Sequence, residues 1–374
     1  MTLTLRFEDG TVRVVSDEGA DRSALVEIAD DYGFLSVDER TGGSRVPAYR
    51  YAELRDALDE REVSYRDRVI DTDPLSLSTR YQRREYQQEA LDAWHEGNDR
   101  GVVELPTGAG KTVLAIAAIA ELGVPTLVVV PTIDLLDQWR REMEAEFDVP
   151  IGQFGGGEQR QEAITVSTYD SAYLKADDVG GEFGFVVFDE VHHLGGEGYR
   201  EIARLLAAPA RLGLTATFER PDGAHEAIAD LVGPRVYGLD ADDLAGDHLA
   251  DYEIRRVEVD LTPEERESYE AAQGTFVDYL KRSGISMQRG SDYQELVKRS
   301  GRDPEAREAL LAKQRARRIV READRKVEEL GRLLDRHRDD RAIVFTASTD
   351  LVYRLSERYL LPAITNETGA AERR

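Results

Sequence analysis

The stretch that decides the fold is RGVVELPTGAGKT, at residues 100–112. Its apolar part, Gly101–Leu105, has the length of a buried strand. A loop containing two glycines, Pro106–Thr112, follows, and apolar residues at helical spacing continue over Lys111–Leu122. A strand, a glycine-rich turn and a helix in this order are the context of a phosphate-binding loop.

The residues of this loop are suited to bind a nucleotide. Gly108 and Gly110, with Ala109 between them, let backbone N–H groups curl around phosphate oxygens, and the helix N-terminus adds the positive end of its dipole. We expect Lys111 to reach the β- and γ-phosphates and the Thr112 hydroxyl to bind Mg²⁺. The strict signature has a glycine immediately before this loop, where the chain has leucine, so the loop is a variant. The alternative is an ordinary corner between a strand and a helix.

A pair of carboxylates follows a second buried strand. The apolar run Phe185–Phe188 leads directly into the sequence DEVH at 189–192. An aspartate at the end of a strand, here Asp189, can hold Mg²⁺ through its water shell, and the neighbouring Glu190 can orient and deprotonate an attacking water. A solvated turn is the alternative. His192 and the histidine after it have no third ligand at zinc spacing, so a zinc site is not expected.

Residues 83–237 alternate short apolar strands with helices. Fully apolar strands between amphipathic helices indicate a parallel sheet that is covered on both faces, and hence one α/β domain. Besides the elements already named, we expect strands at Thr126–Pro131, Ile164–Thr168 and Leu212–Thr217, and a helix at Leu135–Phe147.

The N-terminal residues 1–75 have the pattern of a small α+β domain. Leu3–Phe7 and Val12–Val15 alternate around a turn and predict a β-hairpin, and Tyr51–Leu58 is expected to be helical. No catalytic spacing is present, so a packing or substrate-presenting role is the simplest interpretation.

The C-terminal residues change character. Tyr279–Lys326 holds 14 basic and 7 acidic residues in an otherwise acidic chain, which favours phosphate binding. A solvated helix face is the alternative. The elements expected in this part are a strand at Tyr252–Leu261, helices over about 262–326, a strand at Ala342–Thr346, a helix at Asp350–Leu360 and a strand near Ala363–Thr365.

Charge and composition exclude several classes of protein. The 374 residues carry a formal net charge of −25, and 43 of the 49 basic residues are arginine. Acid spread along the chain, with arginine in place of lysine, indicates a halophilic protein whose net charge maintains solubility. The absence of cysteine excludes disulfides, thiolate zinc sites and cysteine nucleophiles.

Neither a membrane span nor a secretion signal is expected. The apolar run Val113–Ala120 ends at Glu121, well short of the roughly 20 residues that cross a bilayer. The N-terminus, MTLTLRFEDG, has neither the basic nor the apolar region of a signal peptide. We therefore expect a cytoplasmic protein, and the sequence does not indicate an oligomeric state.

The order of these motifs resembles superfamily 2 helicases. Gly108–Thr112, Asp189–His192 and the sequence LTAT at 214–217 are similar to motifs I, II and III of that superfamily. The other matching segments are REYQ at 84–87 for the adenine-reading motif, VPT at 130–132 with QW at 138–139 for motif Ia, STY at 167–169 for motif Ib, and AIVFT at 342–346 for motif IV.

Within that superfamily, the chain resembles archaeal XPB-type DNA helicases. The resemblance implies an N-terminal damage-recognition domain at 1–75, a first RecA-like lobe at 80–240, and an incomplete second lobe at 245–374 that carries a helical thumb at about 262–326. The family's Arg-Glu-Asp element appears as Arg220-Pro221-Asp222. Proline replaces its glutamate, which puts an unwinding role of that element in doubt.

The resemblance also implies roles for individual residues. The cofactors are ATP and Mg²⁺, and the partner is duplex or forked DNA, followed with 3′–5′ polarity in repair or transcription. Arg84 and Gln87 are expected near the adenine, and His192, Thr215 and Thr217 are expected to relay the nucleotide state. The residues expected to contact DNA are Thr132, Thr168, Tyr169, Arg220 and Asp222.

The chain ends before the family's motifs V and VI, so we expect a fragment: a cut piece, an early-stopped gene, or half of a two-chain enzyme. One alternative is a truncated paralogue that binds ATP, DNA or a nuclease without translocating. Another is the ATPase subunit of a restriction system, which would have a nuclease partner. An RNA helicase is disfavoured, because DEVH at 189–192 differs from the form typical of RNA-unwinding enzymes.

Overall fold

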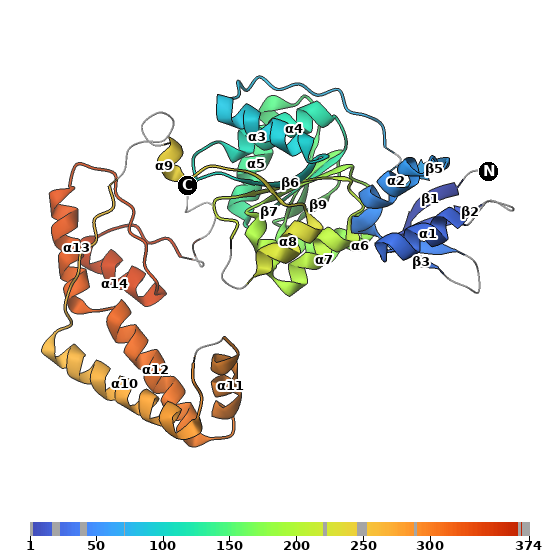
Figure 1. Cartoon of the computed structure of the whole chain (residues 1–374). Helices are drawn as coiled ribbons and strands as arrows, with labels where there is room; N and C mark the ends of the chain where they lie inside the picture. The colour runs from blue at the N-terminus through green and yellow to red at the C-terminus, as the bar shows by residue number, and fades with distance from the viewer. Residues whose placement is uncertain are drawn as a thin grey trace. The chain divides into compact units, whose positions relative to one another are not determined.

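The computed structural model divides the chain into two compact units, Met1–Tyr252 and Glu253–Arg374, and each is described by itself (Figure 1). The residues that the structure describes are 3–16, 23–37, 43–70, 72–219, 223–244, 253–287, 290–365 and 368.

The first unit begins with a five-stranded sheet of order β3-β4-β2-β1-β5. The hairpin between β1 and β2 turns through Asp9 and Gly10, whose φ angles are 49° and 69°. Two consecutive positive φ angles define the tight turn that matches the twist of paired strands. The elements are β1 (Leu3–Glu8), β2 (Thr11–Ser16), α1 (Ser23–Tyr32), β3 (Ser36–Val37), β4 (Ser44–Pro47), the 3₁₀ turn η1 (Ala48–Arg50), α2 (Tyr51–Glu60) and β5 (Tyr65–Arg68).

An eight-stranded sheet of order β13-β6-β12-β11-β7-β10-β8-β9 forms the centre of the first unit. All neighbouring strands are parallel except β8 and β9, which are antiparallel. The strands are β6 (Arg100–Glu104), β7 (Thr126–Val130), β8 (Ile151–Gly155), β9 (Glu158–Arg160), β10 (Ile164–Thr168), β11 (Phe185–Asp189), β12 (Ala210–Thr215) and β13 (Arg235–Gly238).

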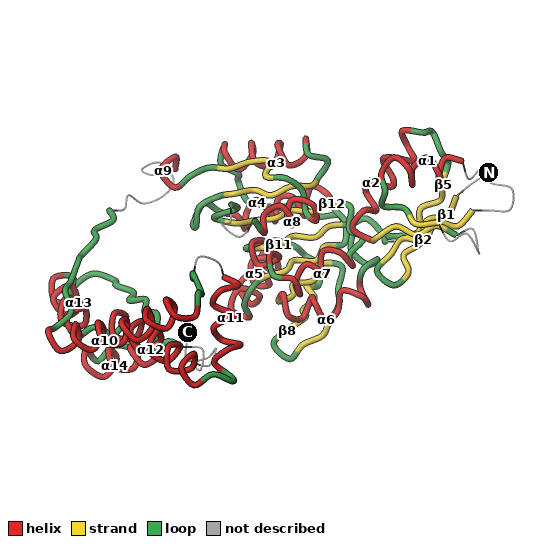
Figure 2. The backbone as a smooth tube through the Cα atoms, turned by 60° about the horizontal axis from the view of Figure 1, so that its bottom comes forward, coloured by secondary structure: helices red, strands yellow, loops and turns green. Residues whose placement is uncertain are grey.

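Helices cover both faces of this sheet (Figures 1 and 2). Alternate strand residues divide between two hydrophobic clusters: Val103 and Val187 pack with α3, α4 and α5, whereas Val102 and Val186 pack with α6, α7 and α8. This arrangement confirms the predicted α/β class. The helices of this part are α3 (Glu85–Glu96), α4 (Lys111–Leu122), α5 (Ile133–Glu146), α6 (Tyr169–Val179), η2 (Val191–Gly195), α7 (Glu197–Leu205), α8 (Ala224–Leu231) and α9 (Ala241–Leu244).

The N-terminal domain shares its core with the lobe. Ala207, which follows α7, is fully buried in the same cluster as the N-terminal strands. A side chain added at Gly180 would overlap the ring of Phe7, so the two parts approach at backbone distance there. Arg50 also forms an ion pair with Asp230 of α8. The N-terminal domain is therefore packed onto the face that carries α6 and α7.

Helices are the regular secondary structure found among the described residues of the second unit. Helices α10 and α12 pack through small side chains, since Ala306 and Ala309 are fully buried against Phe276 and Tyr279. The Lys313 ammonium lies 5.1 Å from the ring centre of Phe276. The helices are α10 (Pro263–Ser283), α11 (Gly290–Ser300), α12 (Pro304–Arg321), α13 (Asp324–Arg336) and α14 (Thr349–Tyr359).

The strands predicted in this unit are not observed. Residues 253–261, 342–346 and 363–365 have no regular secondary structure, and Tyr252 lies outside the described residues. Ile343 and Phe345 are 81% and 90% exposed. A strand exists only when another strand pairs with it, and no partner strand occurs among the described residues of this unit. Among the residues that the structure describes, none of the helices has the length and apolar content that crossing a membrane requires.

Candidate nucleotide site

The site lies at one edge of the eight-stranded sheet. In a parallel sheet the carboxyl ends of all strands meet at the same edge, which is where α/β proteins bind ligands. The phosphate loop follows β6, Asp189 ends β11 and Thr215 ends β12, whereas Thr132 follows β7 and Thr168 ends β10. The strand order places β12 between β6 and β11, and β7 between β11 and β10. The expected nucleotide residues are therefore neighbours, and the expected DNA residues follow directly beyond β11.

The phosphate loop has the predicted backbone. Gly108 and Gly110 have φ angles of 86° and 80°, a region that a side chain disfavours. Thr107 and Gly108 are exposed, and α4 begins at Lys111. The Lys111 ammonium donates a hydrogen bond to the Leu105 carbonyl at 3.0 Å, so the lysine lies folded over its own loop.

Two side chains of helix α3 donate hydrogen bonds to this loop. The Gln87 side-chain nitrogen donates to the Ala109 carbonyl at 3.0 Å, and its oxygen accepts from the Arg84 backbone N–H at 2.9 Å. The Tyr86 hydroxyl donates to the same Ala109 carbonyl at 2.8 Å. Gln87 is 3% exposed. Both polar ends of the Gln87 side chain are thus bonded to protein, and its place near the adenine stays a prediction. Arg84 is exposed, and its adenine contact stays a prediction.

The Asp189 carboxylate is buried and held at both oxygens. The Trp139 indole N–H donates to Oδ2 at 2.8 Å, and the Glu190 backbone N–H donates to Oδ1 at 3.1 Å. Burial raises the pKa of Asp189, the Trp139 bond and the Lys111 charge lower it, and the Glu190 charge raises it, so that the net pKa lies above its ordinary value. Asp189 is 7% exposed, so its carboxylate is nearly covered by protein.

Glu190 begins a chain of polar contacts that crosses to β12. Its φ angle is 48°, a left-handed conformation that costs free energy for any residue but glycine. One carboxylate oxygen lies 3.4 Å from Nδ1 of His192, which in turn lies 3.3 Å from the Thr215 hydroxyl oxygen. The Thr215 hydroxyl donates to the Thr217 carbonyl at 2.9 Å. The structure thus brings together all the residues predicted to relay the nucleotide state.

The residues predicted to contact DNA fall into three groups. Thr132 is exposed at the N-cap of α5. Thr168 is the N-cap of α6 and is 7% exposed. Tyr169 is 2% exposed, and its hydroxyl donates to the Asp189 carbonyl at 3.0 Å; its contact with DNA stays a prediction. Arg220 and Asp222 lie outside the described residues.

The donor set at this edge fits Mg²⁺. Carboxylate and hydroxyl oxygens are the ligands that this ion prefers, and Asp189 and Thr112 supply one of each from β11 and α4. Each Asp189 oxygen accepts one hydrogen bond and keeps a second lone pair. Among the described residues, no group of three or more His, Cys, Asp or Glu side chains is arranged to hold a metal ion.

Sequence reasoning missed the role of Trp139. The sequence Gln138-Trp139 indicated a strand-contacting motif, but the indole lies on the opposite side of α5 from solvent, at 1% exposure. A tryptophan at an apolar helical position is ordinarily core, and only the fold brings β11 beneath it.

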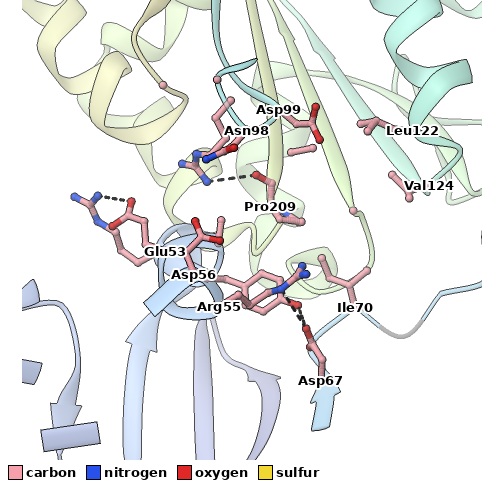
Figure 3. Close-up of a pocket in the computed structure, with 18 of the residues that line it drawn as sticks. Glu53, Arg55, Asp56, Asp67, Ile70, Asn98, Asp99, Leu122, Val124 and Pro209 are labelled. Carbon is pink, nitrogen blue, oxygen red and sulfur yellow. Dashed lines mark hydrogen bonds and ion pairs between the residues drawn. The ribbon is translucent and has the colours of Figure 1, made fainter. Parts of the chain in front are cut away.

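A cavity of about 830 Å³ lies elsewhere, between the N-terminal domain and the lobe (Figure 3). Its lining residues include Glu53, Asp67 and Asp99, but none from the phosphate loop or from 189–192. Arg50 pairs with Glu53 at 2.7 Å, and the Tyr51 hydroxyl donates to Asp67. These pairs lie within the lining of the cavity, which fits a domain interface.

Two protein families match parts of the chain. Residues 5–69 match the damage recognition domain of the xeroderma pigmentosum group B helicase. Residues 80–220 match the res subunit of type III restriction enzymes. The two matches correspond to the five-stranded domain and to most of the eight-stranded lobe.

Individual proteins extend this likeness. The chain is 42% identical over 327 residues to the DNA 3′–5′ translocase XPB2 of Sulfurisphaera tokodaii, covering 87% of the chain and 74% of that protein. It is 36% identical over 214 residues to the DNA 3′–5′ helicase XPB of Mycobacterium tuberculosis, covering 54% of the chain and 38% of that protein. Among solved structures, the Hef helicase domain of Pyrococcus furiosus aligns with a TM-score of 0.44 at 19% identity, over 75% of the chain and 79% of that domain.

Proposed function

The chain belongs to the XPB family of DNA 3′–5′ translocases and helicases, and from this premise we propose that its lobe binds and hydrolyses ATP in order to move along DNA. Motion from 3′ to 5′ is part of the proposal. The observation that carries it is the strand order β6-β12-β11, because it sets the phosphate loop, the Thr215 relay and the Asp189–Glu190 pair side by side.

Each residue at the carboxyl ends of these strands has its own role in binding or hydrolysing ATP. Lys111 leaves the Leu105 carbonyl to bind the β- and γ-phosphates, and the helix N-terminus behind it binds their charge. Asp189 and Thr112 hold Mg²⁺, which, when bound, neutralises charge on the phosphates. Glu190 orients a water and accepts its proton at a carboxylate oxygen. Arg84 lies at the start of α3 and contacts the base.

The relay begins at the same carboxylate. A proton gained at Glu190 changes its interaction with Nδ1 of His192, 3.4 Å away. The imidazole shares its Nδ1 with Thr215, and Thr215 is bonded to the Thr217 backbone on both sides, as donor to the carbonyl and as acceptor from the N–H. Thr217 is exposed, so the nucleotide state reaches the surface through a short polar path.

DNA is contacted from two places in the proposal. Thr132 and Thr168 lie at the N-termini of α5 and α6, where backbone N–H groups bind phosphate oxygens. The basic helices of the second unit contribute Arg307, Arg315 and Arg318, all exposed on α12. These contacts recognise the backbone of DNA and carry no sequence preference.

The acidic surface belongs to the same proposal. The net charge of −25 fits a protein that works in concentrated salt, where repulsion between carboxylates is screened. Assays of this chain are therefore best carried out in high KCl, with DNA binding examined over a series of salt concentrations.

The experiment that tests the function is ATP hydrolysis in high KCl, with and without forked DNA, beside Glu190→Gln. We expect turnover that DNA stimulates and that Glu190→Gln reduces about 10²–10⁴-fold while ATP remains bound. The exposed Glu182→Gln is the matched control and should retain full turnover.

Two other results would contradict the proposal. ATP binding without turnover in the wild-type chain indicates a regulator that binds nucleotide and DNA. Turnover that depends on a bound nuclease, with no effect of forked DNA alone, indicates a restriction-type subunit.

A further inference from the structure

We propose that Trp139 and Tyr169 are positioning residues that hold the Asp189–Glu190 turn from α5 and α6, the two helices whose N-termini meet DNA. The inference rests on the proposed function of this edge as the nucleotide site. Through these two aromatic side chains, a shift of either helix on DNA changes the position of the Mg²⁺ carboxylate.

The first link is the indole of Trp139. It is 1% exposed, and its N–H donates to Oδ2 of Asp189 at 2.8 Å. With Oδ1 held by the backbone N–H of Glu190 at 3.1 Å, neither oxygen can rotate away without breaking a buried hydrogen bond. Leaving a buried donor or acceptor unpaired is costly, so the carboxylate has one orientation as long as α5 stays in place.

The second link is the phenol of Tyr169. Its hydroxyl is buried beside the Asp189–Glu190 turn. It donates to the Asp189 carbonyl at 3.0 Å and lies 3.5 Å from the Glu190 carbonyl. These are the carbonyls on either side of the left-handed Glu190 (φ 48°). A strained backbone persists only when its surroundings fix it, and Tyr169 does so here.

Both aromatic residues lie on helices whose N-terminal residues are expected to contact DNA. Trp139 lies six residues after Ile133, the first residue of α5, which is about 9 Å along a rigid helix. Tyr169 is itself the first residue of α6. The Thr132 and Thr168 caps are thus connected to Asp189 by one helix each.

The chain supplies matched controls for both variants. Trp94 is the other of the two tryptophans; it is fully buried, and its indole donates to the Arg211 carbonyl at 2.9 Å, on α3 and away from the nucleotide edge. Trp139→Phe and Trp94→Phe therefore remove the same group from the same kind of environment. Tyr51, 2% exposed and bonded to Asp67 in the N-terminal domain, is the corresponding control for Tyr169.

The first measurement is the Mg²⁺ concentration that half-saturates binding of N-methylanthraniloyl-ADP to the full chain. We expect Trp139→Phe to raise this midpoint about tenfold, since a hydrogen bond to a charged group contributes at least that much. Trp94→Phe should leave it unchanged. Where turnover is present, the ratio of DNA-stimulated to basal hydrolysis should fall in both Trp139→Phe and Tyr169→Phe, but not in Trp94→Phe or Tyr51→Phe.

The second measurement keeps Trp139 intact. In Trp94→Phe, Trp139 is the single tryptophan, and its indole lies on the carboxylate that binds Mg²⁺. We expect its fluorescence to change when Mg²⁺ is added in the presence of ADP, and the fluorescence of Trp94 in Trp139→Phe to stay constant.

The inference is overturned if Trp139→Phe and Trp94→Phe share one Mg²⁺ midpoint, or if the fluorescence of Trp139 does not respond to Mg²⁺. A wild-type chain without turnover contradicts the proposed function alone, because the midpoint and the fluorescence still test the positioning role. Should Trp139→Phe not fold, the fluorescence of Trp139 in Trp94→Phe decides.

Discussion

Gly110 has two separate reasons to lack a side chain. Its φ angle is 80°, and an added Cβ would overlap the side-chain nitrogen of Gln87, which is fixed to the Ala109 carbonyl. Gly157 has a similar φ of 89° but nothing within 4 Å of such a Cβ. Gly157, between β8 and β9, is therefore a control for the cost of a positive φ without steric overlap.

We predict that Gly110→Ala weakens ATP binding by more than tenfold, whereas Gly157→Ala does not change it. Both should lower the free energy of unfolding by about 1 kcal/mol because of the positive φ. Calorimetric titration with ATP and urea unfolding measure the two effects. Adding Gln87→Ala to Gly110→Ala should restore part of the binding, and equally weakened binding in the two alanine variants would show that overlap plays no role.

The residues of the nucleotide site show what can be predicted from sequence and what cannot. The loop, Asp189 and the relay are predictable because glycine, lysine and carboxylate chemistry is tied to the ends of strands. The direction of the Gln87 and Tyr169 side chains is not predictable in this way, because a motif reports residue type and not direction. Both side chains turn inward and bind backbone carbonyls, and only three-dimensional packing decides that.

Between elements, Arg211 joins two helices to the centre of the sheet. It is fully buried in β12, and its guanidinium donates to the carbonyls of Ala203, Leu206 and Ala208 and, from α8, of Leu231. These carbonyls lie in or just after the last turns of α7 and α8, where a helix leaves its own acceptors unpaired. The guanidinium of Arg211 thus supplies the hydrogen-bond donors that the backbone does not provide to these carbonyls.

Arg211→Met should lower the free energy of unfolding by about 3 kcal/mol or more, because several buried carbonyls are left without their donor. Urea denaturation measures this. Arg204→Met, at an exposed site on α7 where the arginine pairs with Glu201, should change stability by under about 0.5 kcal/mol. Similar destabilisation in the two variants would contradict a special role for Arg211.

A second connection between elements depends on pH. His95 of α3 lies between Asp99 and Glu121 of α4, at 2.6 and 3.1 Å. Burial alone would lower the pKa of His95, but hydrogen bonds and charge from the two carboxylates outweigh it, and the pKa is raised. The protonated ring is therefore favoured in the folded state.

A raised folded-state pKa contributes stability below the unfolded value of about 6.5, and the contribution is lost as pH rises through the folded value. The stability difference between wild type and His95→Gln should be largest near pH 6 and shrink at alkaline pH. Urea unfolding of both proteins across this range measures it. A difference that grows with pH would contradict the assignment.

The elements of the lobe could be predicted from sequence because each parallel strand is a buried apolar run. Ile164–Thr168, Phe185–Asp189 and Lys111–Leu122 agree with the expected bounds. The failures lie at 253–261 and 342–346, where an equally suitable run stays exposed. Strand propensity is local, whereas a strand depends on a partner that the pattern itself does not contain.

For the molecule as a whole, salt acts on two properties in opposite directions. High salt should raise the stability of the fold, because it screens repulsion between carboxylates. It should weaken DNA binding, because it competes with contacts to phosphate. Arg307, Arg315 and Arg318 lie on one face of α12 by helical spacing, and all are exposed.

We predict that the triple variant Arg307→Gln, Arg315→Gln and Arg318→Gln weakens DNA binding and lowers the slope of log affinity against log KCl by about one for each phosphate that an arginine no longer binds. Fluorescence anisotropy with forked DNA over a KCl series gives the slope. The matched control replaces Arg332, Arg336 and Arg338 of the neighbouring α13 region, and an equal change there would contradict a specific role for α12.

The melting temperature of the wild-type chain should rise between about 0.2 and 3 M KCl, because screening relieves repulsion among carboxylates in a chain of charge −25. Differential scanning fluorimetry measures it. A melting temperature that falls over this range would show that ion pairs such as Arg50–Asp230 outweigh the repulsion.

The shared core of the N-terminal domain has a consequence for synthesis on the ribosome. The buried cluster of the N-terminal strands includes Ala207, and Phe7 packs against Gly180. At about 5–20 residues per second, the ribosome reaches Ala207 roughly 7 to 30 s after Ile70. The apolar surface of the N-terminal domain is therefore fully covered only after the lobe has been synthesised. A nascent chain halted near residue 100 would be cleaved by proteases more readily than the finished protein.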